Sequence, residues 1–282
     1  MNNAKELSPE QFRKMQLTEL DMLVEFDRVC QKNKIRYVLF GGSLLGAVRH
    51  KGYIPWDDDA DIGMLREDYN KFKRHINELN PDICYFQDHD TDPEYRWGYG
   101  KLRRTGTKYV RVGQEHLKCK TGIFVDVFPM DDIPLSVFGQ ILQDLHCFCL
   151  RKILWSEVAK YNTKGFWKIW FTLLSKIPVS FAFDQYKIYE KKSRNRTPNR
   201  VRCLSFPATG TLYKKNPINE RYGMPKSWFT ERKKYFFEGK YFFSSRDFDT
   251  VLKYIYGDYM EIPDEKGREQ HSPFSEIKFP EE

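Results

Sequence analysis

The segment IPWDDDADIGML, residues 54–65, places four aspartates within five positions and flanks them with apolar residues. Apolar flanks predict a buried element, whereas closely spaced carboxylates repel one another strongly. We interpret residues 57–64 as a strand, in which successive side chains point to opposite faces. Asp57, Asp59 and Asp61 would then share one face of the strand, and Asp58 would point to the other face.

Three carboxylates on one face require a positive partner. A hard divalent cation suits them best, because Mg²⁺ and Mn²⁺ prefer carboxylate oxygens. A glycosidase-type pair of acids is an alternative, but it needs neither a third acid nor a preceding glycine turn. We therefore predict that Asp57, Asp59 and Asp61 bind Mg²⁺ or Mn²⁺, and that Asp59 and Asp61 are catalytic.

A glycine turn precedes the aspartates. The short apolar run RYVLF (36–40) predicts a strand, and Gly41-Gly42-Ser43 leads from it into a helical segment. Backbone N–H groups at a helix N-terminus bind anions, and glycine lets a phosphate approach the backbone. Gly42 and Ser43 are therefore candidate phosphate-binding residues. A phosphate-binding turn followed by a metal-binding strand is typical of nucleotidyltransferase-type active sites.

A later strand offers a further carboxylate. Asp126 lies within GIFVDVF, where an acid is costly unless it is ion-paired or metal-bound. We predict a catalytic role for Asp126, with an arginine ion pair as the alternative. Asp131 and Asp132 follow Pro129, and we expect them to be loop acids.

Cations and aromatic residues complete the candidate site. As a set, the cations could hold a diphosphate, whereas the tryptophans could face a quaternary ammonium group. The alternatives are ordinary surface charges and ordinary packing. These candidate substrate-binding residues are Arg49, Lys51, Lys101, Arg103, Trp56 and Trp97.

The order of elements predicts an α/β (α+β) fold. We expect a nucleotidyltransferase-like catalytic sheet flanked by helices in residues 1–134, and a region of helices and mixed structure in residues 135–282 that completes the site and its acceptor side. The six cysteines are scattered without a CxxC pair, so we expect buried reduced thiols rather than disulfides or a zinc site.

The composition narrows the partners and the location. The chain has a net charge of +8, but its basic residues are dispersed and no RNA- or DNA-binding module is visible, so we expect no nucleic-acid partner. No apolar run is long enough to span a membrane, and the polar N-terminal sequence indicates a cytoplasmic protein. The basic, aromatic segment FWKIWFTLLSKIP (166–178) is typical of helices that bind the membrane surface, with packing on the catalytic domain as the alternative.

Four segments in order carry a resemblance to a known family. They are FGGSLLGAVRHKGYIPWDDDADIGM (40–64), KLRRTGTKY (101–109), GIFVDVFPMDDIP (122–134) and YGDYMEIP (256–263). The chain thereby resembles the LicD family, the phosphocholine transferases of bacterial surface glycans, which is related to fukutin and fukutin-related protein.

The resemblance implies a nucleotidyltransferase-like fold that cleaves CDP-choline or a similar CDP-alcohol. Phosphocholine would pass to a hydroxyl of a glycan, such as a lipopolysaccharide or a lipid-linked teichoic acid precursor, and CMP would leave. Asp57, Asp59 and Asp61 would bind the metal, Asp126 would lie near it, and Gly42 and Ser43 would hold the donor phosphate. Whether Asp57 or Asp126 completes the metal shell stays open, and so does the choice of choline, glycerol or ribitol as the donor alcohol.

A second enzymatic interpretation uses the same metal site. In it the protein moves a nucleoside monophosphate from an NTP to a small molecule. The products separate the two reactions, because a CDP-alcohol releases CMP and an NTP releases pyrophosphate.

Overall fold

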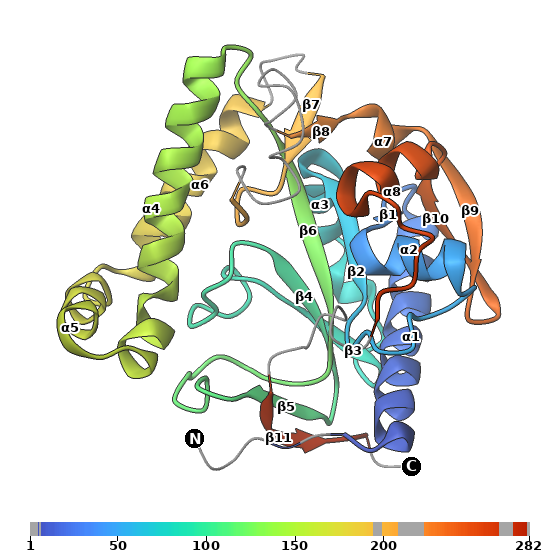
Figure 1. Cartoon of the computed structure of the whole chain (residues 1–282), viewed down its shortest axis with the longest axis horizontal. Coiled ribbons are helices and arrows are strands. Elements are labelled where there is room, and N and C mark those ends of the chain that lie inside the picture. The colour runs from blue at the N-terminus through green and yellow to red at the C-terminus, as the bar shows by residue number, and fades with distance from the viewer. Residues whose placement is uncertain (1–4, 6, 194–198, 208–222, 265–272, 281–282) are drawn as a thin grey trace.

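A central sheet organises the chain, and helices cover it on both sides (Figure 1). The computed structural model describes residues 5, 7–193, 199–207, 223–264 and 273–280. Its strands follow the order β1-β2-β6-β4-β3, with β7 paired to β6 and β8 paired to β7. The sheet strands are β1 (Val38–Leu39), β2 (Asp61–Leu65), β3 (Cys84–Gln87), β4 (Gly100–Arg104), β6 (Phe124–Asp132), β7 (Arg200–Arg202) and β8 (Met224–Pro225). The predicted α/β class is confirmed.

Strand β6 is the axis of this sheet. It pairs in parallel with β2 and antiparallel with β4, and eight of its nine residues are buried. A strand covered on both faces needs a nearly continuous apolar run, which FVDVFPM supplies apart from Asp126. Val125 and Val127 pack in one core cluster, whereas Phe128 and Met130 belong to a second.

The long helix α1 (Pro9–Lys32) closes one side of the sheet. The Ser8 hydroxyl accepts a hydrogen bond from the Gln11 backbone, and Pro9 occupies the first turn, so Ser8 caps the start of the helix. Met22 and Phe26 are fully buried in the first core cluster.

Other short elements surround the sheet. The helices are α2 (Gly41–Arg49), α3 (Arg66–Lys73), α7 (Ser227–Thr230), α8 (Phe248–Tyr256) and the 3-10 turn η1 (Ile76–Glu78). Strands β5 (Lys108–Arg111) and β11 (Phe274–Lys278) form one two-stranded sheet, and β9 (Arg232–Phe237) and β10 (Lys240–Ser245) form another.

Segments from late in the chain pack back on the N-terminal half. Phe237 and Phe242 of the β9–β10 hairpin are buried in the same core cluster as α1, and α8 contacts α2. Strand β7 also pairs with the end of β6. The division of the chain at residue 134 stays a prediction.

Three helices stand on the other side of the sheet, at the left of Figure 1. They are α4 (Val137–Asn162), α5 (Gly165–Leu174) and α6 (Val179–Ser193). Cys147, Leu150 and Leu154 of α4 pack with Ala182 and Tyr186 of α6 in a third core cluster. Despite the length of α4, none of the helices in the described ranges has an apolar stretch that could cross a bilayer.

Candidate metal and phosphate site

Three adjacent strands bring the candidate catalytic residues together. Asp61 of β2 lies opposite Asp126 of β6, and Lys101 of β4 lies opposite Asp126 on the other side. Carboxylate oxygens of Asp59, Asp61 and Asp126 all lie within 4.8 Å of one another. Three oxygens at this separation could bind one hard divalent cation.

The first three aspartates lie on a loop, so the strand predicted over residues 57–64 is wrong at its start. Strand β2 begins only at Asp61. The amide of Asp57 donates to the Ile54 carbonyl at 3.0 Å, and the side chain of Gln16 on α1 donates to the carbonyls of both residues. Because this loop is a turn held by α1, strand alternation does not govern the directions of its side chains.

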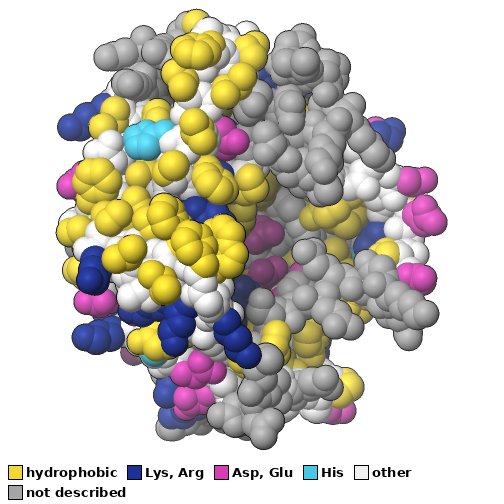
Figure 2. All heavy atoms as spheres, turned by 60° about the vertical axis from the view of Figure 1, so that its left-hand side comes forward, with side chains coloured by type: hydrophobic (Ala, Val, Ile, Leu, Met, Phe, Trp, Pro, Cys, Tyr) yellow, Lys and Arg dark blue, Asp and Glu magenta, His cyan; other side chains and the backbone are white. Residues whose placement is uncertain are grey.

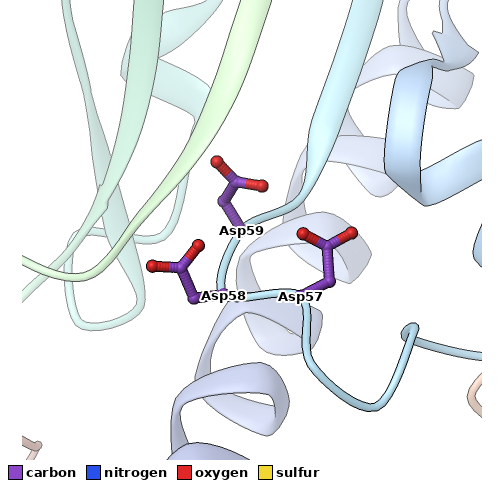
Figure 3. A group of neighbouring side chains, drawn as sticks. All are labelled: Asp57, Asp58 and Asp59. Atoms are coloured by element: carbon purple, nitrogen blue, oxygen red, sulfur yellow. The ribbon is translucent and has the colours of Figure 1, made fainter. Parts of the chain in front are cut away.

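Asp58 consequently lies closer to its neighbours than we predicted. Figure 3 shows the side chains of Asp57, Asp58 and Asp59 fanning out from the loop, and their carboxylate oxygens lie within 4.8 Å of one another. The Tyr109 hydroxyl donates to Asp58 at 3.4 Å. Burial alone would lower the pKa of the nearby Arg111, but the charges of Asp58, Tyr109, Asp126 and Asp59 together outweigh burial and raise it.

The two groups of carboxylates share Asp59 and differ in their other members. Asp126 joins Asp59 and Asp61, whereas Asp57 joins Asp58 and Asp59. Of the two residues left open as the third ligand, Asp126 is therefore the one grouped with both Asp59 and Asp61.

The buried carboxyl groups of the site resist ionisation. Burial raises the pKa of Asp61 well above its usual value, and the charges of Asp59, Asp126 and Asp57 raise it further. Glu19 of α1, which is 1% exposed, has a pKa raised by burial and by the charges of Asp59, Asp58 and Asp57. A cation bound among these carboxylates would reverse this effect.

Glu19 and Gln16 were missed by the sequence analysis. Both are polar residues within a long helix, where they are usually exposed. A signal was available for Glu19 in its spacing, because Met15, Glu19, Met22 and Phe26 recur on one buried face of α1.

The glycine turn contacts the aspartates directly. A Cβ on Gly42 would collide with Oδ2 of Asp57, and one on Gly41 would lie 2.8 Å from Oδ2 of Asp61. Gly41 also has a φ of +50°, which favours glycine. The buried Ser43 hydroxyl accepts a hydrogen bond from the Asp61 amide at 2.8 Å. Phe40, the residue that precedes α2, provides no side-chain cap, and the start of this helix adjoins the carboxylates of Asp57 and Asp61.

Lys101 is the predicted cation that lies within this site. It forms an ion pair with Asp126, and its Nζ lies 3.3 Å from the centre of the Phe124 ring. Burial lowers the pKa of Lys101 to about 8. Arg103 also lies over Phe124, but its buried guanidinium donates to the Gln87 side chain at 2.7 Å and the Gly122 carbonyl at 2.8 Å.

The structure places the remaining predicted residues elsewhere. Arg49 and Lys51 lie at the C-terminal end of α2, roughly 12 Å along the helix from the glycine turn. Arg49 donates to the carbonyls of Tyr259 and Glu261, which tie it to the C-terminal motif of residues 256–263. Trp56 packs at 6.0 Å against the ring of His50, at the same end of α2.

Trp97 lies apart from Trp56. Its ring is 5.2 Å from the Tyr95 ring, and it lines a cavity beside α4. The structure therefore does not join the two tryptophans into one aromatic cage.

Comparison with known proteins connects this site to a protein family. The sequence model described as "LicD/FKTN/FKRP, nucleotidyltransferase domain" matches residues 34–167, which include the glycine turn and all of the aspartates discussed above. The lipopolysaccharide cholinephosphotransferase LicD of Haemophilus influenzae is 28% identical over 273 residues, which cover 92% of this chain and 95% of that protein.

Two further relatives match shorter parts. The uncharacterized protein RP689 of Rickettsia prowazekii is 29% identical over 215 residues, 74% of this chain and 70% of that protein. The human ribitol 5-phosphate transferase FKRP is 62% identical over 34 residues, 12% of this chain and 7% of that protein.

Proposed function

Because residues 34–167 form a domain of the LicD/FKTN/FKRP family, we propose that this protein transfers phosphocholine, or a similar phospho-alcohol, from a CDP-alcohol to a hydroxyl of a cell-surface glycan. The relatives named as a cholinephosphotransferase and a ribitol 5-phosphate transferase both move a phospho-alcohol. The observation that carries the proposal is the contact between the carboxylates and the Gly41-Gly42 turn. This contact would place a metal ion next to a bound phosphate.

The carboxylates fit Mg²⁺ or Mn²⁺. Asp59, Asp61 and Asp126 offer hard oxygen ligands, and a divalent cation would counter the burial and the neighbouring negative charges that raise the pKa of Asp61. Such an ion supplies charge neutralisation for the diphosphate. The amides at the start of α2, including Gly42 and Ser43, would bind the donor phosphate.

The bond changes of the proposed reaction are simple. The acceptor hydroxyl oxygen attacks the phosphorus that bears the alcohol, the bond from that phosphorus to the oxygen of CMP breaks, and CMP leaves with the bonding electrons. Asp126 would accept the proton of the acceptor hydroxyl. Lys101, paired with Asp126 and resting on Phe124, would hold that carboxylate in position.

An exposed apolar face on α4 and α5 supports a membrane location for this reaction. Figure 2 shows hydrophobic side chains gathered over this side of the molecule. The exposed side chains that make up this face include Phe138, Ile141, Leu142, Leu145, Phe148 and Trp155 of α4, and Phe166, Trp167, Ile169, Trp170 and Leu173 of α5. A contiguous apolar surface of this kind marks an interaction site. We call these residues the apolar face.

The charge around the apolar face indicates its partner. Residues 135–178 contain six lysines and arginines but only two acids, Asp144 and Glu157. Both acids are ion-paired, with Arg202 at 2.9 Å and Lys160 at 2.8 Å. A second copy of this basic face would be repelled, whereas an anionic leaflet would attract it. We propose that the protein is cytoplasmic and binds peripherally to the inner face of the membrane, where a lipid-linked glycan would be the acceptor.

A screen of donors tests the proposed reaction. The protein is incubated with CDP-choline, CDP-glycerol or CDP-ribitol and Mg²⁺ or Mn²⁺, and CMP release is measured with and without glycan acceptors. We expect metal-dependent CMP release that increases with an acceptor and disappears in Asp59→Ala. Pyrophosphate release from an NTP, without CMP from any CDP-alcohol, would instead establish nucleotidyl transfer.

A further inference from the structure

A cavity of about 360 Å³ lies between the residues that precede β4, helices α4 and α6, and the segment that follows β7. Its walls include the aromatic side chains of Trp97, Tyr99, Trp155 and Tyr186. Phe148 and Trp155 belong both to this cavity and to the apolar face. The cavity therefore opens at the edge of the surface that we propose to face the membrane.

Tyr99 connects the cavity to the carboxylates. Its ring lines the cavity, and the centre of that ring lies 5.4 Å from Nζ of Lys101. Lys101 in turn forms an ion pair with Asp126. Figure 2 shows a hollow beside the apolar face with acidic side chains visible inside it, and these acids are not among the described residues that line the cavity. A molecule in the cavity could thus extend toward the carboxylate that we assign as the proton acceptor.

Two hydroxyl groups on residues that line the cavity lack a good hydrogen-bond partner. Tyr186 is 6% exposed, and its hydroxyl has no hydrogen-bond partner among the described residues. The Ser205 hydroxyl has only the thiol of Cys203 beside it, which is a weak partner. A buried hydroxyl without a partner costs about 1–3 kcal/mol, so a ligand with its own hydroxyl groups would be favoured here.

The cavity combines aromatic walls with these hydroxyl groups. Gly98 contacts the two residues that carry these hydroxyl groups, because a Cβ at this position would collide with Oγ of Ser205 and lie 3.5 Å from the Tyr186 ring. Apolar walls with a few polar groups are typical of small-molecule sites. A sugar ring suits this arrangement, since its C–H face can pack on aromatic rings while its edge forms hydrogen bonds.

The charges at the cavity argue against a quaternary ammonium ligand. Arg96, Arg151 and Lys152 all line it, and no acidic residue does among the described lining residues. Arg96 donates to the Leu154 carbonyl at 2.8 Å, and this bond does not neutralise its positive charge, whereas Arg151 also pairs with Asp144 at 3.6 Å. Choline would be repelled, whereas a neutral or anionic sugar would not.

We propose that this cavity binds a sugar unit of the acceptor glycan and that Tyr186 and Ser205 donate or accept hydrogen bonds with its hydroxyl groups. The assignment of the sugar as the acceptor rests on the proposed function. The binding of a sugar in the cavity does not, and it can be measured without turnover.

Fluorescence titration tests sugar binding directly. Trp97 and Trp155 line the cavity, so their emission should change when a sugar binds. The probes are methyl glycosides of hexoses and N-acetylhexosamines, their phosphates, and choline. We expect a saturable change with at least one sugar and none with choline, and an affinity about tenfold lower in Tyr186→Phe, in line with the loss of one hydrogen bond. Gly98→Ala should also lose sugar binding, whereas Tyr241→Phe on the exposed hairpin β9–β10 should retain it.

Kinetics then assign the sugar to the acceptor side. In Tyr186→Phe the KM for the glycan should rise about tenfold and the KM for the CDP-alcohol should not change. Sugar affinity that is unchanged in both Tyr186→Phe and Gly98→Ala would overturn the proposal, and so would choline binding that these variants abolish. If the variants lose sugar binding but no CDP-alcohol is cleaved by the native protein, the proposed function fails and the sugar site stands.

Discussion

Asp61 and Asp126 lie opposite each other on the neighbouring parallel strands β2 and β6, although 64 positions separate them in the chain. Parallel pairing requires a long crossover connection, which here contains α3, β3, β4 and β5. The register of the two strands therefore decides whether Asp126 joins Asp59 and Asp61. This relationship has a direct experimental consequence.

We predict that Asp59→Ala and Asp61→Ala each reduce transfer by about 10²-fold or more, because each removes a carboxylate from the metal site. CMP release from the CDP-alcohol measures the loss, and thermal unfolding checks that the variants are folded. Asp184→Ala, on an exposed part of α6, serves as the matched control. Near-normal transfer by either site variant would disprove the metal assignment.

The same assay separates the two candidates for the third ligand. Asp126→Asn should raise the Mg²⁺ concentration required for half-maximal activity more than Asp57→Asn does, because only Asp126 groups with both Asp59 and Asp61. The opposite order would assign Asp57 to the metal.

Gly42→Ala should reduce transfer by about tenfold to a hundredfold without lowering the free energy of unfolding. The added Cβ collides with the Asp57 carboxylate, which can move aside, and alanine suits a helix better than glycine. Gly106→Ala is the reciprocal control, because Gly106 has a φ of +75° and no atom near the new Cβ. It should cost about 1–2 kcal/mol of stability and leave transfer unchanged. Equal activity in the two variants would contradict the contact between turn and aspartate.

Phe138→Ser in α4 and Ile169→Ser in α5 should each weaken binding to anionic vesicles by about tenfold or more, because burying one large apolar side chain contributes about 1.5–3 kcal/mol. Cosedimentation with phosphatidylglycerol vesicles measures binding. Tyr241→Ser, which removes a side chain of similar exposure from the β9–β10 hairpin, should bind normally. Binding that does not depend on anionic lipid would remove the membrane proposal.

One thiol should react quickly with iodoacetamide in the folded protein. Five of the six cysteines are buried, as predicted, but the expectation fails for Cys149, which is exposed on α4 next to Phe148. Burial raises the pKa of Cys84 and Cys147 to about 12 and that of Cys203 to about 11, so these thiols remain protonated and unreactive at pH 8. Cys149→Ser should abolish the fast phase, and anionic vesicles should slow it in the native protein. A fast phase that survives in Cys149→Ser would contradict this assignment.

Asp131→Ala should lower the free energy of unfolding by about 3–5 kcal/mol, because it leaves the Arg66 guanidinium, whose side chain is only 14% exposed, without its main partner. Arg66 donates two hydrogen bonds of 2.7 Å to Asp131, whose side chain is fully buried. Urea unfolding measures the change. Asp90→Ala removes a half-exposed acid that also pairs with lysine, and it should cost under about 1 kcal/mol. Similar losses in the two variants would show that burial does not distinguish these ion pairs.

The ion pair between Arg66 and Asp131 shows that the expectation of Asp131 and Asp132 as loop acids is wrong. Strand β6 continues through Pro129 to Asp132, and Asp131 lies in its buried part. Proline usually ends a central strand, so the local sequence favoured a loop. Here β6 continues because it stays paired on both sides of the proline. Pro129 lies opposite Met64 of β2, and β7 then pairs with Asp131 and Asp132.

The sequence by itself determined the elements whose signals are local. The start of α1 at Ser8 follows from its capping box. The glycine turn follows from Gly41 and Gly42, where a side chain would block the close approach of the aspartates to the backbone. The same holds for the identity of the carboxylates, because an acid within an apolar strand such as FVDVF needs a partner wherever it folds. These features depend on neighbours within a few positions, so a single chain segment contains the information.

The tertiary structure alone decided which of these residues meet. Turn geometry imposed by Gln16 of α1, rather than strand alternation, sets the directions of Asp57, Asp58 and Asp59. The cations predicted to share one phosphate site do not lie together, because Lys101 pairs with Asp126 whereas Arg49 lies at the far end of α2. Such contacts join residues far apart in the sequence, and they depend on strand register and helix packing, which no local pattern specifies.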